Sequence, residues 1–335
     1  MFGFELYLKR NAKKFDEYLA TFYVDGTHPD MTRYLYGPLA AYSNNAGKRH
    51  RPLICLLACE AVGGDPKLAW PAGASIEHFH TAALIHDDIM DASQTRRGEP
   101  CLHVREGEAL AINAGDLALS LVTGTVVDDP NLGDVLKLRV LHELVEMTTR
   151  TIEGQALDIG WARDDRFDLT IEDYLLMANH KTAFYSGAAP LAVGAIIGGG
   201  SEAQIEALRA FGMSTGLAFQ IQDDVLYLVG TRESTKKDFR SDIAEGKRTL
   251  VVVHALGNSS KRERLLAILS ARDNDTAALD EAVGIMQEAG SIDFAKGYAE
   301  KLVLEAKDAL EVALPHSRAR DLLASMADFF ITRNG

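Results

Sequence analysis

Apolar residues recur at three- and four-residue intervals along nearly the whole chain of 335 residues, and almost no segment alternates strictly over the length of a strand. Such spacing places apolar side chains on one face of an α-helix. Loop-forming residues interrupt the pattern at 62–67, 128–134, 162–168, 197–201 and 271–276. Between these breaks the pattern predicts helices of roughly 15 to 30 residues, longer than the globular average of about 12.

Two helix starts are visible in the residue types. Thr170 precedes Asp173 by three residues, and Ser201 precedes Gln204 by three. Both pairs are close to the capping-box pattern, in which each side chain bonds the other's backbone N–H. No Pro/Ser-rich linker divides the chain. We therefore predict an all-α protein, one large helical bundle that forms a single domain over residues 1–335.

Composition narrows the function classes. The formal charge of −13 argues against a nucleic-acid partner, since no basic stripe is present to meet phosphates. The first twenty residues form an amphipathic pattern rather than the apolar centre of a signal peptide. The apolar run Ala188–Gly200 is too short for a bilayer, which requires about 20 residues. We expect a cytoplasmic protein with no integral membrane segment.

Aspartate pairs follow two apolar segments. "LIHDDIMD" contains Asp87, Asp88 and Asp91, and "FQIQDD" ends at Asp223 and Asp224. In a bundle, two such helix ends that face each other would form one entrance, lined by aspartates, to one apolar cavity. Asp87 and Asp91 lie one helical turn apart and repel each other unless a cation lies between them. Mg²⁺ fits two such carboxylates and a substrate phosphate. A solvated helix end is the alternative, although the helix dipole disfavours acids there.

Three basic stretches accompany the acids. Arg96 and Arg97 follow the first aspartate motif, and guanidinium groups suit diphosphate oxygens. An earlier stretch, "AGKRHRP", contains Lys48, Arg49 and Arg51; a later one contains Lys236, Lys237, Lys247 and Arg248. Each stretch alone is typical of a solvated face. Together, in an acidic chain, they indicate clamps for two separate diphosphates.

The chain resembles the trans-isoprenyl diphosphate synthases, the polyprenyl synthetase family, from about residue 30 to the C-terminus. Six motifs occur in the family's order: "AGKRHRP", "LIHDDIMDASQTRRGEP", "GQALD", "HKTA", "FQIQDD" and "SDIAEGKRT". One motif would be weak evidence, but six in order are very specific.

The resemblance implies a role for each matching residue. Isopentenyl diphosphate would be held by Lys48, Arg51, His80 and Arg97, and Arg96 would face the allylic diphosphate. Asp87 and Asp91 would hold two Mg²⁺ ions and Asp223 a third. Lys181, Lys237 and Lys247 match the allylic clamp and catalytic loop, and Thr182 and Gln220 match residues beside the developing allylic cation. His78 and His86 receive no role and are expected to be core histidines or to support neighbouring ligands.

The same resemblance implies an isoprenoid synthase fold around a central apolar cavity, and a homodimer. The implied reaction is Mg²⁺-dependent condensation of isopentenyl diphosphate with an allylic diphosphate (dimethylallyl, geranyl or farnesyl). A dry cavity would protect the allylic cation from water. The constellation contains no poised nucleophile–base pair, and the reaction requires none.

Small residues precede the first aspartate motif. Ala82 and Ala83 cannot block an isoprenoid tail, whereas Phe79, four residues before Ala83, has a ring large enough to form a floor. One helical turn is about 5.4 Å, roughly one isoprene unit. We therefore expect a product longer than farnesyl, namely geranylgeranyl diphosphate. A core role for Phe79, with another helix as the floor, is an equally open reading.

Two other functions remain open. One is a weakly active regulatory subunit of a heteromeric prenyl synthase, although such subunits tend to lose the acidic motifs. The other is a terpene cyclase, although a cyclase needs no second diphosphate clamp. The chain departs from the family pattern at a few positions, where it has Ala46, Tyr227, Thr231, Lys236 and Arg240. The tyrosine replaces an acid, which bears on the third metal, and the two basic residues replace loop glycines, which bears on loop closure.

Overall fold

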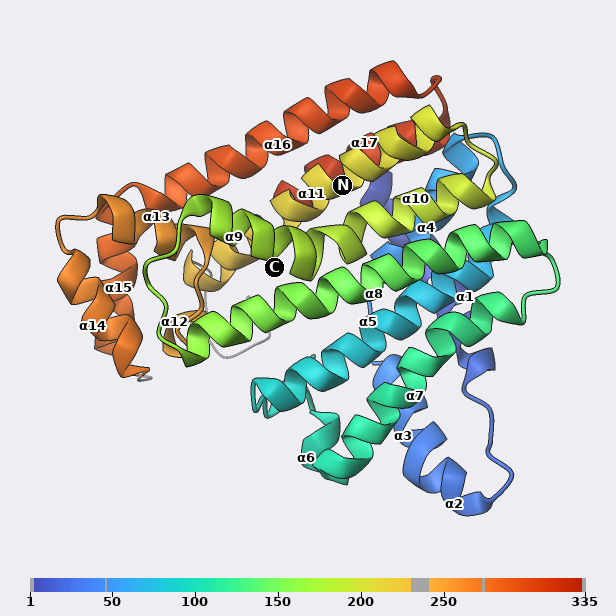
Figure 1. The fold of residues 1–335 in the computed structure, drawn as a ribbon, viewed down its shortest axis with the longest axis horizontal. Helices are drawn as coiled ribbons and strands as arrows, with labels where there is room; N and C mark the ends of the chain where they lie inside the picture. The colour runs from blue at the N-terminus through green and yellow to red at the C-terminus, as the bar shows by residue number, and fades with distance from the viewer. Residues whose placement is uncertain (1–2, 46, 230–240, 273–274, 333–335) are drawn as a thin grey trace. The chain divides into compact units, whose positions relative to one another are not determined.

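The computed structural model describes residues 3–45, 47–229, 241–272 and 275–332. It is 81% helical with almost no strand, which confirms the predicted all-α class (Figure 1). The chain forms two compact units. Unit 1 comprises residues 1–146, 189–209 and 313–326, and unit 2 comprises 147–188, 210–312 and 327–335. That residues 1–335 act as a single domain stays a prediction.

The elements of unit 1 alternate long helices with short turns. They are α1 (Gly3–Leu19), η1 (Ala20–Phe22), α2 (Pro29–Met31), η2 (Thr32–Tyr36), α3 (Gly37–Ser43), α4 (His50–Ala61), η3 (Pro66–Ala69), α5 (Trp70–Met90), β1 (Thr95–Arg96), β2 (Glu99–Pro100), α6 (Leu102–Glu106), α7 (Glu108–Val127) and α10 (Ala189–Ile197).

Unit 2 contains α9 (Ile171–Ala178), the π-helix η4 (Asn179–Ala188), α12 (Ser241–Ala244), α13 (Leu250–Asn258), α14 (Arg262–Ala271), α15 (Thr276–Glu288) and nearly all of α16 (Ser291–Ala313). Three further helices are divided between the two units: α8 (Asp134–Arg163), α11 (Glu202–Val229) and α17 (Arg318–Thr332).

The predicted breaks separate helices as expected. The turn at 128–134 lies between α7 and α8, and the turn at 197–201 between α10 and α11. Thr170 and Asp173 form a complete capping box at the start of α9. Ser201 and Gln204 exchange equivalent bonds at the start of α11. Local sequence chemistry therefore sets where these helices begin.

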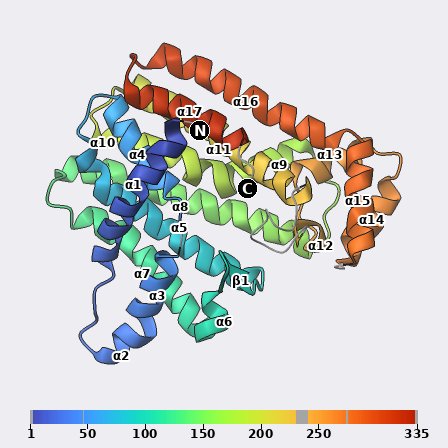
Figure 2. The ribbon, with the colours of Figure 1, turned by 180° about the vertical axis from the view of Figure 1, so that it is seen from behind.

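Helix α5 is the core helix of unit 1. Every residue from Ala72 to Ala82 is buried, so the helix is covered on all sides. It contacts α4, α6, α7 and α10. Figure 2 shows β1 just beyond the end of α5, so the core helix leads directly to the motif that contains the arginine pair.

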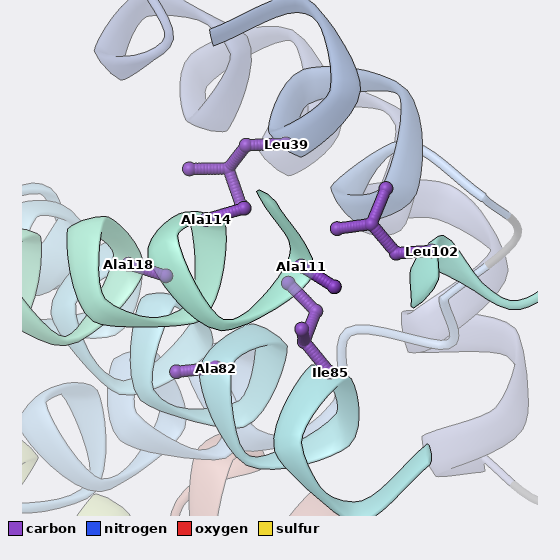
Figure 3. Packing of buried hydrophobic residues seen from close by; sticks show 7 residues of the cluster. All are labelled: Leu39, Ala82, Ile85, Leu102, Ala111, Ala114 and Ala118. Atoms are coloured by element: carbon purple, nitrogen blue, oxygen red, sulfur yellow. The ribbon is translucent and has the colours of Figure 1, made fainter. Parts of the chain in front are cut away.

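Small side chains let α5 and α7 approach closely. Ala82 and Ile85 of α5 face Ala111, Ala114 and Ala118 of α7 (Figure 3). Leu39 of α3 and Leu102 of α6 close the same cluster. Ala82, expected to line the product cavity, therefore packs into this core, whereas Ala83 is half-buried.

Helix α7 is long and apolar enough to cross a membrane by length and composition alone. Glu108 and Asp116 interrupt its apolar run, so the run is not recognisable as a membrane span from the sequence pattern. Core helices of globular proteins meet the same criteria, and α7 packs along α5. The absence of a membrane segment and the cytoplasmic location stay predictions.

Unit 2 is held by aromatic contacts between its helices. Phe219 of α11 meets Phe330 of α17 edge-on, with ring centroids 4.8 Å apart. His254 of α13 stacks on Phe294 of α16 at 4.1 Å. Such pairs add about 0.5–1.5 kcal/mol beyond the burial of their area.

His78 lies in the core of unit 1. This was one of the two expectations for it, the other being a histidine that supports a neighbouring ligand. The side chain is fully buried, its Nδ1 lies 3.2 Å from the Tyr23 hydroxyl, and that hydroxyl donates to Ser43. Burial lowers the pKa of His78 to about 3. The imidazole is therefore neutral in the folded protein at pH values where a free histidine takes up a proton.

This burial predicts a specific pH dependence of stability. Below about pH 6.5 the unfolded chain binds a proton at His78 that the folded protein excludes until about pH 3, so stability falls as the pH is lowered. Through this one group, the free energy of unfolding falls by up to about 1.4 kcal/mol for each pH unit. The free energy of unfolding of His78→Gln, measured from pH 7 to 4.5, should fall less steeply than that of the wild type. The exposed His316→Gln is the control, and parallel curves for wild type and His78→Gln would contradict the assignment.

Candidate active site

Arg49 is the structural anchor of the first basic stretch. Its backbone is left-handed, with φ of 51°, directly before α4, a conformation that costs a non-glycine residue about 1–2 kcal/mol. The buried guanidinium donates to Asp16 and Glu77, each at 2.6 Å, and to the Ser43 carbonyl. Burial opposes its charge, but Glu77 and Asp16 raise the pKa of Arg49 above its usual range. This network fixes the turn between Lys48 and Arg51.

Arg51 and His80 meet on neighbouring helices. Arg51 lies in the first turn of α4, and its Nη1 is 3.2 Å from Nε2 of His80 on α5. Both side chains are buried, whereas Lys48 is exposed. Burial, followed by the charges of Arg51 and Arg97, holds the pKa of His80 well below its usual range. A neutral imidazole therefore lies among arginines, in a positive environment suited to an anion.

A two-residue hairpin orients the arginine pair. β1 and β2 pair antiparallel, with Arg96 opposite Glu99. Between them, Arg97 and Gly98 have φ of 55° and 83°, as a type I′ turn requires. Arg97 Nη1 donates to the Asn45 carbonyl at 2.5 Å, whereas Arg96 turns towards α5. This hairpin was not predicted from the sequence; the glycine after Arg97 is the one local signal for it.

The three acids of the first motif differ in their surroundings. Asp87 and Asp91 are half-buried on the last turn of α5. Asp88 is 1% exposed and accepts hydrogen bonds from Tyr42 at 2.6 Å and from Arg96 Nε at 2.5 Å. Arg96 also places Nη2 3.4 Å from Asp87. Two carboxylates thus remain accessible, and the middle one is enclosed.

The π-helix η4 carries the "HKTA" motif of unit 2. π-helices are rare and often occur at functional sites. A Cβ at Gly154 on α8 would lie 2.2 Å from the Lys181 backbone nitrogen, so only glycine permits this approach. One turn further along α8, Asp158 forms an ion pair with Lys181. The "GQALD" and "HKTA" motifs therefore meet as one contact.

A hydrogen-bond chain links the other candidate residues of unit 2. Thr182 donates to Gln220 Oε1 at 2.7 Å, and Gln220 Nε2 donates to Asp224 at 2.6 Å. Tyr174 donates to the second oxygen of Asp224 at 2.8 Å. Burial, then Asp242, raises the pKa of Asp224 to about 8. Its neighbour Asp223 is half-buried, so the second aspartate pair repeats the division into one enclosed and one accessible carboxylate.

The late basic stretch divides between two roles. Lys247 pairs with Glu245 at 2.8 Å and with Asp242 at 3.3 Å. Arg248, expected to belong to a diphosphate clamp, is instead 2% exposed, stacks over Phe167 at 4.1 Å and donates to the Arg166 carbonyl at 2.9 Å. Its planar guanidinium secures the loop after α8.

Several predicted positions lie outside the described residues: Ala46, Thr231, Lys236, Lys237 and Arg240. Tyr227 is half-buried on α11. The structure gathers Arg51, His80, Arg96, Arg97, Asp87 and Asp91 in unit 1, and Lys181, Thr182, Gln220, Asp223 and Lys247 in unit 2. That the two aspartate pairs share one cavity stays a prediction.

The oxygen donors of these acids suit a hard cation. Across the described part of the chain, no three His, Cys, Asp or Glu side chains are grouped to hold a metal by themselves. Half-buried carboxylates match Mg²⁺, which usually takes one or two carboxylates and completes its shell with water and phosphate. The accessible aspartates therefore fit a metal shared with a substrate.

Comparison with known proteins identifies the family. The polyprenyl synthetase family model matches residues 32–286. The chain belongs to the polyprenyl synthetase family. It is 46% identical over 289 residues to a short chain isoprenyl diphosphate synthase of Methanothermobacter thermautotrophicus, with 86% of each chain covered. It is 37% identical to a geranylgeranyl diphosphate synthase of Methanosarcina mazei, again with 86% of each covered.

The fold comparison agrees with this assignment. The crystal structure of a geranylgeranyl pyrophosphate synthetase from Pyrococcus horikoshii superposes with a TM-score of 0.90 at 36% identity, covering 98% of both chains. The predicted isoprenoid synthase fold and the predicted enzyme class, a prenyltransferase of isoprenoid biosynthesis, are both confirmed. In this polyprenyl synthetase, the described part of the first motif leads into α4, and the other five motifs lie on α5 and its hairpin, α8, η4, α11 and the segment around α12.

Proposed function

We propose that this polyprenyl synthetase condenses isopentenyl diphosphate with an allylic diphosphate and releases diphosphate. The observation that carries the proposal is the joint arrangement in unit 1, where an arginine–histidine cluster suited to an anion accompanies two accessible carboxylates suited to Mg²⁺. The names of its relatives, short chain isoprenyl and geranylgeranyl diphosphate synthases, support the same reaction.

The proposed site for isopentenyl diphosphate consists of Lys48, Arg51, His80 and Arg97. Lys48 is exposed and can reach outward, while Arg51 is held against His80. Because burial leaves His80 neutral, its ring can donate or accept a hydrogen bond without adding charge. The cluster thus offers a compact diphosphate both positive charges and hydrogen-bonding groups that are held in fixed directions.

We propose that Arg96 of unit 1 acts on the allylic diphosphate, and that Lys181 and Lys247 of unit 2 do so as well. Lys237, to which the family resemblance assigns the same role, lies outside the described residues. Asp87, Asp91 and Asp223 would hold about three Mg²⁺ ions, and bound Mg²⁺ neutralises charge on the leaving diphosphate. The lysines and Arg96 orient that diphosphate while the allylic C–O bond breaks and its electron pair leaves with oxygen.

The oxygens of Thr182 and Gln220 are proposed to face the developing allylic cation. The Thr182–Gln220 hydrogen bond fixes both oxygens. The double bond of isopentenyl diphosphate then attacks the allylic carbon, and the proton lost from the new chain passes to diphosphate.

We expect elongation to depend on Mg²⁺ and on Asp87. Asp87→Ala should lower kcat by about two to three orders of magnitude, the scale for loss of an electrostatic stabiliser. Labelled isopentenyl diphosphate and an allylic primer provide the assay, and Asp116→Ala, an exposed acid on α7, is the control. An elongated diphosphate supports the proposal. A hydrocarbon product would indicate a cyclase, activity only with a partner protein would indicate a regulatory subunit, and near-normal turnover of Asp87→Ala would contradict the metal assignment.

Geranylgeranyl diphosphate is the proposed main product. Ala82 is enclosed in the α5–α7 core, so Ala83 and Phe79 are the remaining positions on the face that precedes Asp87. Ala83 is too small to stop a growing tail, and Phe79, one turn earlier, is the proposed floor. Geranylgeranyl, geranylfarnesyl and farnesyl diphosphate synthases all occur among the relatives, so the proposed chain length rests on the residues of α5.

Phe79→Ala should lengthen the product by about one isoprene unit, since one helical turn adds about 5.4 Å of depth. Chromatography of dephosphorylated products provides the measurement. Phe79→Leu leaves a smaller cavity, folds more readily and should give an intermediate mixture. An unchanged product from a folded Phe79→Ala protein would assign the floor to another helix, and farnesyl diphosphate from the wild type would reject the argument.

A homodimer is proposed from the exposed apolar side chains of α7 and α8. Leu138 and Val145 of α8 are 68% and 56% exposed, and the seven-residue spacing continues at exposed Ile152 and Ile159. Residues seven apart lie on one face of a helix, so these four side chains form one apolar stripe along α8. Clustered apolar residues at a surface mark an interaction site.

Sedimentation should therefore give twice the mass of one chain. Leu138→Glu should shift the protein towards monomer, because a charge replaces an apolar contact. Leu304→Glu on α16, 62% exposed, is the matched control. A wild-type monomer at micromolar concentration would overturn the proposal.

A further inference from the structure

The second aspartate of each pair has no part in the reaction proposed above. Asp88 is 1% exposed and Asp224 is 6% exposed. In each case one oxygen accepts a tyrosine hydroxyl from a different element: Tyr42 of α3 for Asp88, and Tyr174 of α9 for Asp224. The same arrangement thus occurs independently in both units, which indicates a shared purpose for the enclosed carboxylates.

In unit 1, the second oxygen of Asp88 accepts a hydrogen bond from Arg96 Nε at 2.5 Å. Two short hydrogen bonds, 2.6 and 2.5 Å long, therefore connect Tyr42 to Arg96 through Asp88, and we call this chain the relay. Burial opposes the charge of Arg96, but Asp88 raises the pKa of Arg96 above its usual range, so the guanidinium stays charged.

The relay limits the directions open to Arg96. A free arginine side chain has about 2 kcal/mol of rotamer entropy, which must be lost when it binds a phosphate. With Nε held by Asp88, the terminal nitrogens are directed towards Asp87, at 3.4 Å from Nη2. Arg96 is thus positioned at the accessible carboxylate before any substrate arrives.

We propose that Tyr42 is a positioning residue for the allylic diphosphate: its hydroxyl fixes Asp88, and Asp88 orients Arg96. This inference rests on the proposed function for the identity of the substrate. Tyr42 reaches Asp88 from α3, a helix that contains none of the predicted substrate or metal residues. Its role is therefore exerted through Arg96 and not by contact with the substrate.

Tyr42→Phe removes only the hydroxyl. The KM for the allylic diphosphate should rise about tenfold, near the lower end expected for a hydrogen bond to a charged group. The KM for isopentenyl diphosphate should stay within about twofold. Tyr23→Phe is the matched control, because Tyr23, like Tyr42, is a half-buried tyrosine of unit 1 whose hydroxyl bonds a side chain, here Ser43. Asp88→Asn keeps an acceptor for Tyr42 but removes the charge opposite Arg96, and should reproduce the selective rise.

A double-mutant cycle separates positioning from general destabilisation. In an Arg96→Ala background, Tyr42→Phe should cause no further rise in the allylic KM. Equal effects on both substrates, additive effects in the cycle, or a Tyr42→Phe enzyme that matches Tyr23→Phe would each overturn the proposal.

Binding of inorganic diphosphate with Mg²⁺, measured by calorimetry, makes the test independent of turnover. Tyr42→Phe should weaken this binding severalfold, Tyr23→Phe should not, and the Arg96→Ala background should again remove the difference. A wild type that binds diphosphate but forms no elongated product would reject the proposed function, while the pattern of binding among the variants would still decide the role of Tyr42. Unchanged binding in folded Tyr42→Phe would reject the positioning role.

Discussion

A buried charge must be neutralised within the protein, and this constraint organises unit 1. Four arginines, at positions 49, 51, 96 and 97, lie in or beside two short motifs. Arg49 is neutralised by Asp16 and Glu77, and Arg96 by Asp88. Removing one partner of such a pair leaves an isolated buried charge, which costs about 3–5 kcal/mol. The internal carboxylates thus hold Arg49 within the fold and fix the position of Arg96.

In unit 2, close contacts between backbone segments position the side chains of the candidate site. Gly154 brings α8 against the backbone of Lys181, and Gly187 approaches Gly212 of α11 so closely that a Cβ there would lie 2.1 Å from a carbonyl oxygen. Both contacts clamp the π-helix η4, whose wider turn changes the angular spacing of its side chains. Lys181 and Thr182 can therefore be directed to Asp158 and Gln220 from adjacent positions.

Local chemistry in the sequence predicts the fold well because it acts over three or four residues. Thr170 caps α9 through a residue three positions away, and the loop-forming breaks end helices directly. Motif spacing likewise predicts that Asp87 and Asp91 share one face. The roles of Arg248 and Asp88 could not be predicted in this way, because their partners Arg166 and Tyr42 lie 82 and 46 positions away. The hairpin was missed because two-residue strands leave no periodicity.

Consecutive helical residues point about 100° apart, since a turn contains 3.6 residues. An Asp-Asp dipeptide is therefore the shortest sequence that can present one carboxylate outward and tuck the other inward at the same level of a helix. At 87–88 and 223–224, the outward-facing carboxylate and the enclosed carboxylate belong to different residues, which are encoded by different codons. A lineage could lose the outward acid, to which we assign the metal, yet inherit an intact scaffold. Loss of the inward acid would instead disturb the architecture itself, so the two positions are open to different evolutionary fates.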